Sequence, residues 1–207
     1  LSSIVKAEWG VNMTEGVTEI SQSIYDLHML IFWICVGIGV VVFGVMFYVM
    51  FKHRKSKGAV AAQFDESVTL EWLWTVIPTI ILIAMAVPAT KTLVEMYDAS
   101  DAQVDIKITG YQWKWQYDYL GEDVSFFSNL STSRDAVYNK EEKGENYLLE
   151  VDKEVVIPTG QKVRFLITSN DVIHAWWVPE FAVKKDAIPG YVNESWVNVP
   201  VGQEGVY

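Results

Sequence analysis

The chain has 207 residues, of which 51% are hydrophobic, and a formal net charge of −10. This length leaves room for one globular domain together with apolar segments. The acidic balance disfavours nucleic acid as a partner. The only cysteine is Cys35, which excludes a disulfide bond between two residues of this sequence.

Two long uncharged runs lie in the N-terminal half of the chain, at residues 29–51 and 72–90. A helix of about 20 apolar residues spans the hydrocarbon core of a bilayer. Pro78 and Pro88 would be costly in an exposed soluble helix, but membrane helices tolerate proline better. The alternative is that the two runs form buried core helices of a soluble protein. The lengths of the runs and their charged flanks argue against it. We predict a transmembrane helical hairpin over residues 29–90.

The segment between the two runs begins with the basic stretch "KHRKSK", residues 52–57. Positively charged loops stay on the cytoplasmic side or its equivalent. The sequence therefore predicts that residues 1–28 form an outer N-terminal arm. It also predicts a connection over residues 91–103 and an outer domain over residues 104–207.

The outer domain carries the pattern of β-strands. Apolar and polar residues alternate in "VDIKIT" (residues 104–109) and in "KVRFLIT" (residues 162–168). This period of two indicates half-buried strands. Residues 121–146 are polar and are expected to form a surface excursion. We predict an antiparallel β-sandwich or barrel, and the fold class is a membrane helical hairpin followed by a β-domain.

An aromatic stretch, "GYQWKWQYDY", covers residues 110–119. On a strand, Trp113, Trp115, Tyr117 and Tyr119 would line one face. Such a face is usually core packing. Four large aromatic residues in so short a stretch also suggest a docking platform, or a point where electrons enter the protein.

Two ionisable residues allow both a structural and a chemical interpretation. Glu71 lies at the start of the second apolar run, where a carboxylate stabilises a helix N-terminus or admits protons. His174 lies in "NDVIHAWWVPEF" and is the only histidine beyond the apolar region. It could be a hydrogen-bonded core or surface residue, a catalytic base or a metal ligand. Imidazole suits copper, but residues 91–207 contain no cysteine to provide a thiolate.

The outer domain is acidic, with 18 acidic and 10 basic residues from Asp98 onward. If these charges cluster on one face, they would attract a cationic partner over long distances, at a rate that falls as salt rises. The alternative is that the acidic surface only improves solubility.

Taken together, these stretches resemble subunit II of the haem–copper cytochrome c oxidases, in a bacterial form. The resemblance covers nearly the whole chain. It rests on four stretches in the family's order and spacing, "LEWLWTVIPTIILIAMAVPA", "GYQWKWQYDY", "DVIHAWWVPEF" and "KKDAIPGYVNE". The family implies a two-helix hairpin followed by a cupredoxin-like β-barrel. It also implies an integral protein of a bacterial or mitochondrial inner membrane, with the barrel in the periplasm or intermembrane space.

The resemblance also implies roles for individual residues. His174 matches the first ligand of the binuclear copper centre CuA, and Trp113 matches the tryptophan where electrons arrive from cytochrome c. Glu71 matches the carboxylate at the mouth of the K proton pathway. The implied docking residues for cytochrome c are Asp118, Glu122, Asp123 and Asp171. Electrons then pass to haem a in subunit I, which holds the haems and CuB, reduces oxygen and pumps protons. Subunit III and membrane lipid are further expected partners.

The chain departs from the family pattern near its end. The family's two bridging cysteines and remaining copper ligands follow the position of Tyr207, so these 207 residues are not expected to hold CuA alone. Three explanations would account for the missing copper ligands. The sequence could be a fragment, a split subunit completed by another chain, or a copper-free quinol oxidase subunit. The quinol explanation is disfavoured by the presence of His174, the paired tryptophans and "DAIPG". A non-redox docking or assembly scaffold is the alternative from another functional class.

Overall fold

The computed structural model describes residues 11–144 and 146–207. The first ten residues of the predicted N-terminal arm therefore lie outside the described residues. The chain divides into two compact units. One is formed by residues up to 25 together with residues 93–207, and the other by residues 26–92.

The first long helix, α1 (Glu19–Lys52), begins well before the uncharged run at Met29. Its start is fixed by the buried pair Thr18 and Ser21. The amide of Ser21 donates to Thr18 Oγ1 over 3.0 Å, and the amide of Thr18 donates to Ser21 Oγ over 2.9 Å. This reciprocal arrangement satisfies amides that the first helical turn leaves unpaired. It places the helix start inside the range predicted for the arm.

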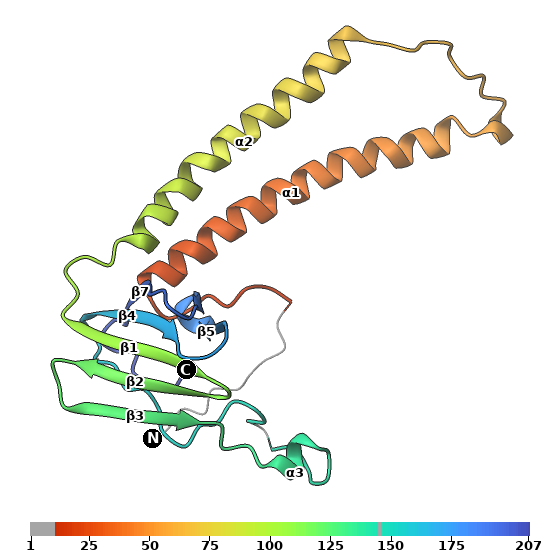
Figure 1. The fold of residues 1–207 in the computed structure, drawn as a ribbon. Helices are drawn as coiled ribbons and strands as arrows, with labels where there is room; N and C mark the ends of the chain where they lie inside the picture. Colours follow the sequence, from red (N-terminus) through yellow and green to blue (C-terminus); the bar gives the residue numbers. More distant parts are fainter. Residues whose placement is uncertain (1–10, 145) are drawn as a thin grey trace. The chain divides into compact units, whose positions relative to one another are not determined.

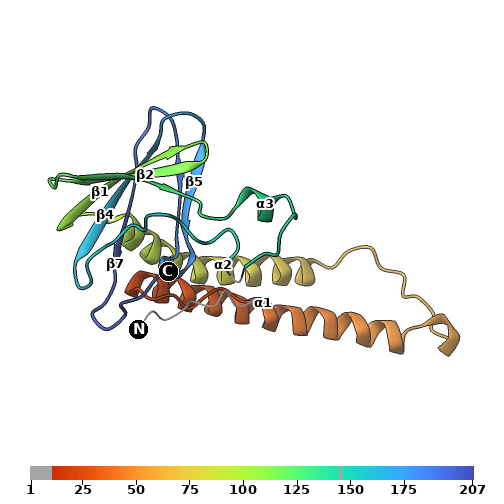
Figure 2. The same ribbon diagram turned by 90° about the horizontal axis from the view of Figure 1, so that it is seen from below.

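The second long helix, α2 (Val68–Tyr97), contains both Pro78 and Pro88. Figure 2 shows the two helices joined by an irregular segment with one short 3-10 turn, η1 (Lys55–Lys57). Both helices are long and apolar enough to cross a membrane. The predicted helices are confirmed, and α2 continues past Thr90. The assigned boundary of the hairpin stays a prediction.

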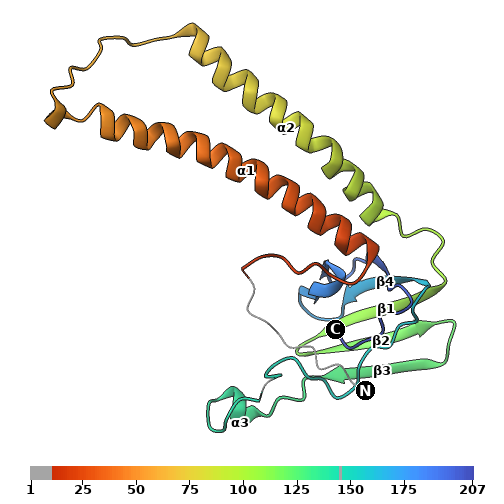
Figure 3. The same cartoon turned by 180° about the vertical axis from the view of Figure 1, so that it is seen from behind.

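The outer domain contains a five-stranded sheet with the order β3-β2-β1-β4-β7. Figure 1 and Figure 3 show β4, β1, β2 and β3 side by side. Its strands are β1 (Val104–Tyr111), β2 (Lys114–Leu120), β3 (Val124–Asn129), β4 (Lys162–Ser169) and β7 (Asn193–Asn198). The strands predicted from alternating residues are β1 and β4, and β4 alternates between half-buried and buried positions along its whole length.

A second sheet pairs β5 (His174–Val178) with β6 (Val183–Ala187) through the 3-10 turn η2 (Pro179–Phe181). The hydrophobic core contains buried residues from both sheets, including Ile106, Ile108, Phe165, Ile167, Trp176 and Val183. Phe165 of β4 and Trp176 of β5 pack with ring centroids 4.8 Å apart. Aromatic packing at this distance joins the two sheets and holds β5 in place.

Three details differ from the sequence predictions. The pair β1–β4 is parallel, although the other paired strands are antiparallel. Residues 124–129, predicted to lie in a surface excursion, form the edge strand β3, and the short helix α3 (Arg134–Val137) follows it. The residues described here form two sheets rather than a closed barrel. Pairing between strands distant in sequence decides the parallel β1–β4 pair and the arrangement of the sheets, so local periodicity could not predict them. Strand β3 pairs with its neighbour β2, and its mostly exposed sequence shows no clear apolar face.

Candidate functional site around His174

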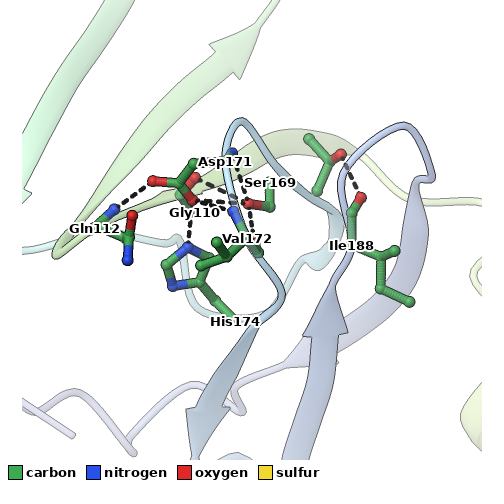
Figure 4. Close-up of polar contacts among 8 residues, drawn as sticks. Gly110, Gln112, Ser169, Asp171, Val172, His174 and Ile188 are labelled. Carbon is green, nitrogen blue, oxygen red and sulfur yellow. Dashed lines mark hydrogen bonds and ion pairs between the residues drawn. The ribbon is translucent and has the colours of Figure 1, made fainter.

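His174 is the first residue of β5 and pairs with Ala187 of β6. It lies near the ends of β1 and β4, because the parallel register of these strands places Gly110 opposite Ser169. The amide of Asn170 donates to the carbonyl of Gly110 over 3.0 Å, which continues this pairing beyond β4. Figure 4 shows the resulting cluster, in which the loop before β5 folds over the end of β1.

Asp171 is the centre of the hydrogen-bond network in this cluster. Its Oδ1 atom lies 2.7 Å from His174 Nε2 and accepts from the amide of Val172 at 2.6 Å. Its Oδ2 atom accepts from the amide of Gln112 at 2.7 Å. The Ser169 hydroxyl donates to Oδ1 over 3.3 Å. The carboxylate therefore connects the loop before β5 to the turn between β1 and β2.

These contacts lower the pKa of Asp171 to about 2, chiefly through the hydrogen bond from His174 and then through the backbone amides. The carboxylate is therefore ionised at neutral pH and can only accept hydrogen bonds. His174 must then carry its proton on Nε2 to donate to Asp171. This assignment leaves Nδ1 as the ring nitrogen available to a ligand.

The imidazole of His174 is enclosed by the backbone and by another ring. The side chain is only 14% exposed. Its ring lies 5.7 Å from that of Trp115, centroid to centroid, in an edge-to-face arrangement. A Cβ atom placed on Gly110 would lie 2.8 Å from His174 Cδ2 and 3.1 Å from Trp115 Cζ3. Only glycine leaves room for the two rings to approach the strand this closely.

The metal-ligand prediction can be tested for chemical fit. The Nε2 atom of His174 faces a carboxylate at 2.7 Å, which is how proteins orient imidazole ligands toward metals. The residues therefore fit one ligand position. Within the described residues, no group of three or more His, Cys, Asp and Glu side chains could hold a metal ion. The only cysteine, Cys35, belongs to α1.

The four residues of the aromatic stretch do not share one environment. Trp113 lies in the turn between β1 and β2 and is 84% exposed. Tyr117 is buried and accepts a hydrogen bond from Trp176 Nε1 at 3.2 Å, while Trp115 and Tyr119 pack beside the core. Burial raises the pKa of Tyr117. The core interpretation therefore holds for these three residues, and Trp113 is the exposed exception.

The predicted acidic residues are spread from one end of β2 to the other rather than gathered in one cluster. Asp171 lies at the Trp113 end, where it bonds Gln112. Asp118 is within β2, and its carboxylate accepts from Gln116 Nε2 at 3.1 Å and from the Ser125 hydroxyl. Glu122 and Asp123 are exposed in the turn after β2. A seven-residue strand is roughly 23 Å long, so the acidic residues span that distance.

Glu71 lies in the first turn of α2, as its sequence position suggests. Its amide donates to the carbonyl of Ser67 over 3.0 Å. Glu71 belongs to the unit formed by residues 26–92, whereas His174 and Trp113 belong to the other unit. A role in capping the helix and a role in proton transfer both remain compatible with this position.

Sequence reasoning missed several participants in the cluster, namely Gly110, the Ser169 hydroxyl and the backbone amides of Gln112 and Val172. A glycine inside a strand pattern marks a close approach by another group, so Gly110 carried a usable signal. The contact of Gln112 with Asp171 joins residues 59 positions apart. Its formation depends on the parallel pairing of β1 with β4, and the local sequence gave no sign of that pairing.

Comparison with protein families gives two matches that together cover most of the chain. The model for the periplasmic domain of cytochrome c oxidase subunit II matches residues 104–207. The model for the transmembrane domain of the same subunit matches residues 6–92. The two matched ranges follow one another as the helical part and the β-domain do in the fold.

Individual proteins show the same similarity. The probable cytochrome c oxidase subunit 2 of Rickettsia bellii is 35% identical over 199 residues, which cover 96% of this chain and 72% of that protein. Its counterpart in Rickettsia felis is also 35% identical, and there the chain covers 61% of the relative. A crystal structure of the periplasmic domain of subunit II from Bradyrhizobium japonicum shares 38% identity. The match covers 49% of this chain and 67% of the Bradyrhizobium chain, with a TM-score of 0.41.

Proposed function

This chain belongs to the cytochrome c oxidase subunit II family, and we propose that it accepts electrons from cytochrome c and delivers them toward subunit I of a terminal oxidase. The family and the two apolar helices make it an integral membrane protein with its C-terminal domain on the outer side. As a member of this family it is a subunit of an oxidoreductase complex that contains further subunits. In this proposal cytochrome c is the electron donor, and the electron passes through this subunit to subunit I.

The observation that carries the proposal is the orientation of His174. Its Nε2 atom is held 2.7 Å from the Asp171 carboxylate, and the ring is packed against Trp115 and Gly110. A histidine needed only for packing does not require a carboxylate that fixes its tautomer. This arrangement supports a role for Nδ1 as a metal ligand.

The family implies the binuclear copper centre CuA in this subunit. A copper centre supplies one-electron redox chemistry, while the protein contributes position, burial and electrostatic tuning. His174 would hold one coordination position. One imidazole cannot hold two copper ions, so His174 alone would not complete the centre. The haems and CuB would be held by subunit I.

The exposure of Trp113 supports the proposal that electrons enter the protein at this residue. Its indole is available at the tip of the β1–β2 turn, and the adjacent Gln112 amide is bonded to Asp171, which in turn contacts His174. In the proposal, cytochrome c docks above this turn. Asp118 of β2 and Glu122 and Asp123 of the turn after it attract its positive face, and Asp171 adds charge at the Trp113 end.

Glu71 is proposed as the entrance to a proton pathway of the assembled oxidase. Ionisable residues at membrane level often mark such paths, and its place in the first turn of α2 supports this assignment. Subunit III and membrane lipid complete the proposed surroundings of the helices. Oxygen reduction and proton pumping would take place in subunit I.

Metal analysis of the intact purified complex tests the proposed function. Two copper ions for each copy of this subunit, with a mixed-valence electron paramagnetic resonance signal, are expected. Absence of both would favour a copper-free quinol oxidase subunit or a non-redox scaffold. The intact mass of the native polypeptide and the coding sequence beyond Tyr207 would show where the remaining ligands are encoded.

A further inference from the structure

We propose that Asp171 is a positioning residue that fastens the Gln112–Trp113 turn to His174, so that the exposed tryptophan and the imidazole are held together as one body. Its relevance to electron transfer rests on the proposed function. The structural arrangement itself requires neither copper nor cytochrome c. Figure 4 shows the carboxylate between the two elements.

The two oxygen atoms of Asp171 serve different parts of the chain. Oδ2 accepts from the amide of Gln112 at 2.7 Å, at the turn that follows β1. Oδ1 lies 2.7 Å from His174 Nε2 and 2.6 Å from the amide of Val172, in the loop before β5. Charge-assisted hydrogen bonds of this length are among the strongest in proteins. Displacement of either element would therefore strain the bond to the other.

The surrounding backbone limits where Asp171 can lie. The parallel pairing of β1 and β4 places Gly110 opposite Ser169, and the amide of Asn170 donates to the Gly110 carbonyl. The amide of Asp171 donates to the Ser169 hydroxyl over 3.2 Å. These contacts of the backbone alone are enough to place Asp171 next to the end of β1.

This role differs from that of an acidic docking residue. The Asp171 side chain is 29% exposed, and both carboxylate oxygens already accept internal hydrogen bonds. Asp123 lies in the exposed β2–β3 turn, and by contrast its carboxylate has no hydrogen bond or ion pair within the described part of the chain. Removal of either charge would weaken attraction of a cation, but only loss of Asp171 would disconnect the turn from His174.

Two substitutions separate the contributions of the two oxygen atoms. Asp171→Ala removes both. Asp171→Asn keeps the size of the side chain but has one acceptor oxygen and one donor nitrogen. In one orientation the asparagine amide would keep the bond to His174 and present a donor to the Gln112 amide. In the other orientation it would keep Gln112 and present a donor to His174. The asparagine variant therefore retains half of the connection.

The test uses the full chain in lipid nanodiscs, free of metal, at pH 7. Nitrogen NMR reports the tautomer of His174, and amide hydrogen exchange reports protection of Gln112. In the parent chain, a single tautomer with the proton on Nε2 and a protected Gln112 amide are expected. Asp171→Ala should mix the tautomers and speed Gln112 exchange by about tenfold, the loss expected for one hydrogen bond. Asp171→Asn should disturb one of the two readouts.

Asp123→Asn is the matched control, because it removes the same charge without breaking an internal bond; it should leave both readouts unchanged. Amide protection of Ile106 and Phe165 in the core verifies that each variant is folded, and Asp171→Asn decides the case if Asp171→Ala does not fold. An unchanged tautomer and unchanged Gln112 exchange in a folded Asp171 variant would overturn the proposal. Because these readouts need no metal or donor, they are independent of the copper analysis.

Discussion

Trp115 of β2 and His174 of β5 meet edge to face, with 5.7 Å between their ring centroids and 64° between their planes. Both rings lie over Gly110 of β1, which has no side chain to separate them. Contributions from three strands therefore fix the imidazole from several sides. Rigid support of this kind lets a ligand keep its geometry when its surroundings change.

We expect Gly110→Ala to disturb this arrangement. The added Cβ would lie 2.8 Å from His174 Cδ2 and 3.0 Å from His174 Cγ, so the ring must move. Overpacking of a buried position typically costs about 1–3 kcal/mol. Urea unfolding should show that loss, and copper content of the assembled oxidase should fall with it. Gly144→Ala is the control, since nothing lies within 4 Å of its Cβ position. Equal stability of the two variants would contradict the close approach.

The parts of the fold that were predicted from sequence are those with a local pattern. Alternation of apolar and polar residues located β1 and β4, and the apolar runs located α1 and α2. The early start of α1 was missed because Thr18 and Ser21 are capping residues outside the apolar run. Strand β3 was missed because its sequence, "VSFFSN", is mostly exposed at the sheet edge. An edge strand of this kind lacks a clear apolar face.

The candidate site was predictable only in its individual residues. His174 and Trp113 could be named from their motifs, and the exposure of Trp113 agrees with a surface role. The internal bonds of Asp171 could not be foreseen, because they require Gln112 and His174 to meet through the β1–β4 pairing. A surface carboxylate and a carboxylate that joins two elements look the same in a sequence.

Replacement of Trp113 by leucine tests its role in receiving electrons. The side chain is 84% exposed, so the change should alter stability by less than about 0.5 kcal/mol. The rate of electron transfer from reduced cytochrome c, measured by stopped flow, should fall while the dissociation constant stays nearly the same. Trp177→Leu is the control, since Trp177 is also exposed, at 61%. Equal losses in rate and affinity would count against a specific electron-transfer role.

Charge removal at the far end of β2 tests the docking surface. Glu122→Gln combined with Asp123→Asn should slow association with cytochrome c several-fold at low salt and flatten its salt dependence. Both side chains lie in the exposed β2–β3 turn, so folding should be unaffected. Association rates measured across a salt series provide the check. Glu142→Gln, at another exposed position, serves as the control, and an unaltered salt slope in the double variant would argue against docking there.

Glu71→Gln tests the proposed proton entrance. The substitution keeps the size of the side chain but removes its ionisable group. Turnover of the assembled oxidase should slow, while cytochrome c binding stays unchanged. Glu66→Gln, just before α2, provides a nearby control that removes a carboxylate outside the helix. Unchanged turnover with a less stable helix would identify Glu71 as a carboxylate that only stabilises the start of α2.

The ion pair between Asp105 and Arg164 gives a stability prediction that depends on pH. The two residues face one another in the parallel β1–β4 pair and form two hydrogen bonds of 2.8 Å each. The Arg164 guanidinium lowers the pKa of Asp105, chiefly through these hydrogen bonds. Both side chains remain about one-third exposed, so solvent screens the interaction. At neutral pH, Asp105→Asn should therefore lower the free energy of unfolding by only about 0.5–1 kcal/mol.

The direction of the pH effect follows from the lowered pKa of Asp105. The native carboxyl binds a proton less readily than the unfolded one, whose pKa is about 3.9. Its stabilising contribution is therefore complete above that value, and it is lost as the pH falls toward the lower native pKa. Urea unfolding at pH 7 and at successively lower pH should show the parent and Asp105→Asn chains converging in stability. Arg164→Gln should remove the same dependence, because it leaves Asp105 without its partner. A constant difference between parent and Asp105→Asn across this range would show that ionisation of Asp105 does not stabilise the sheet.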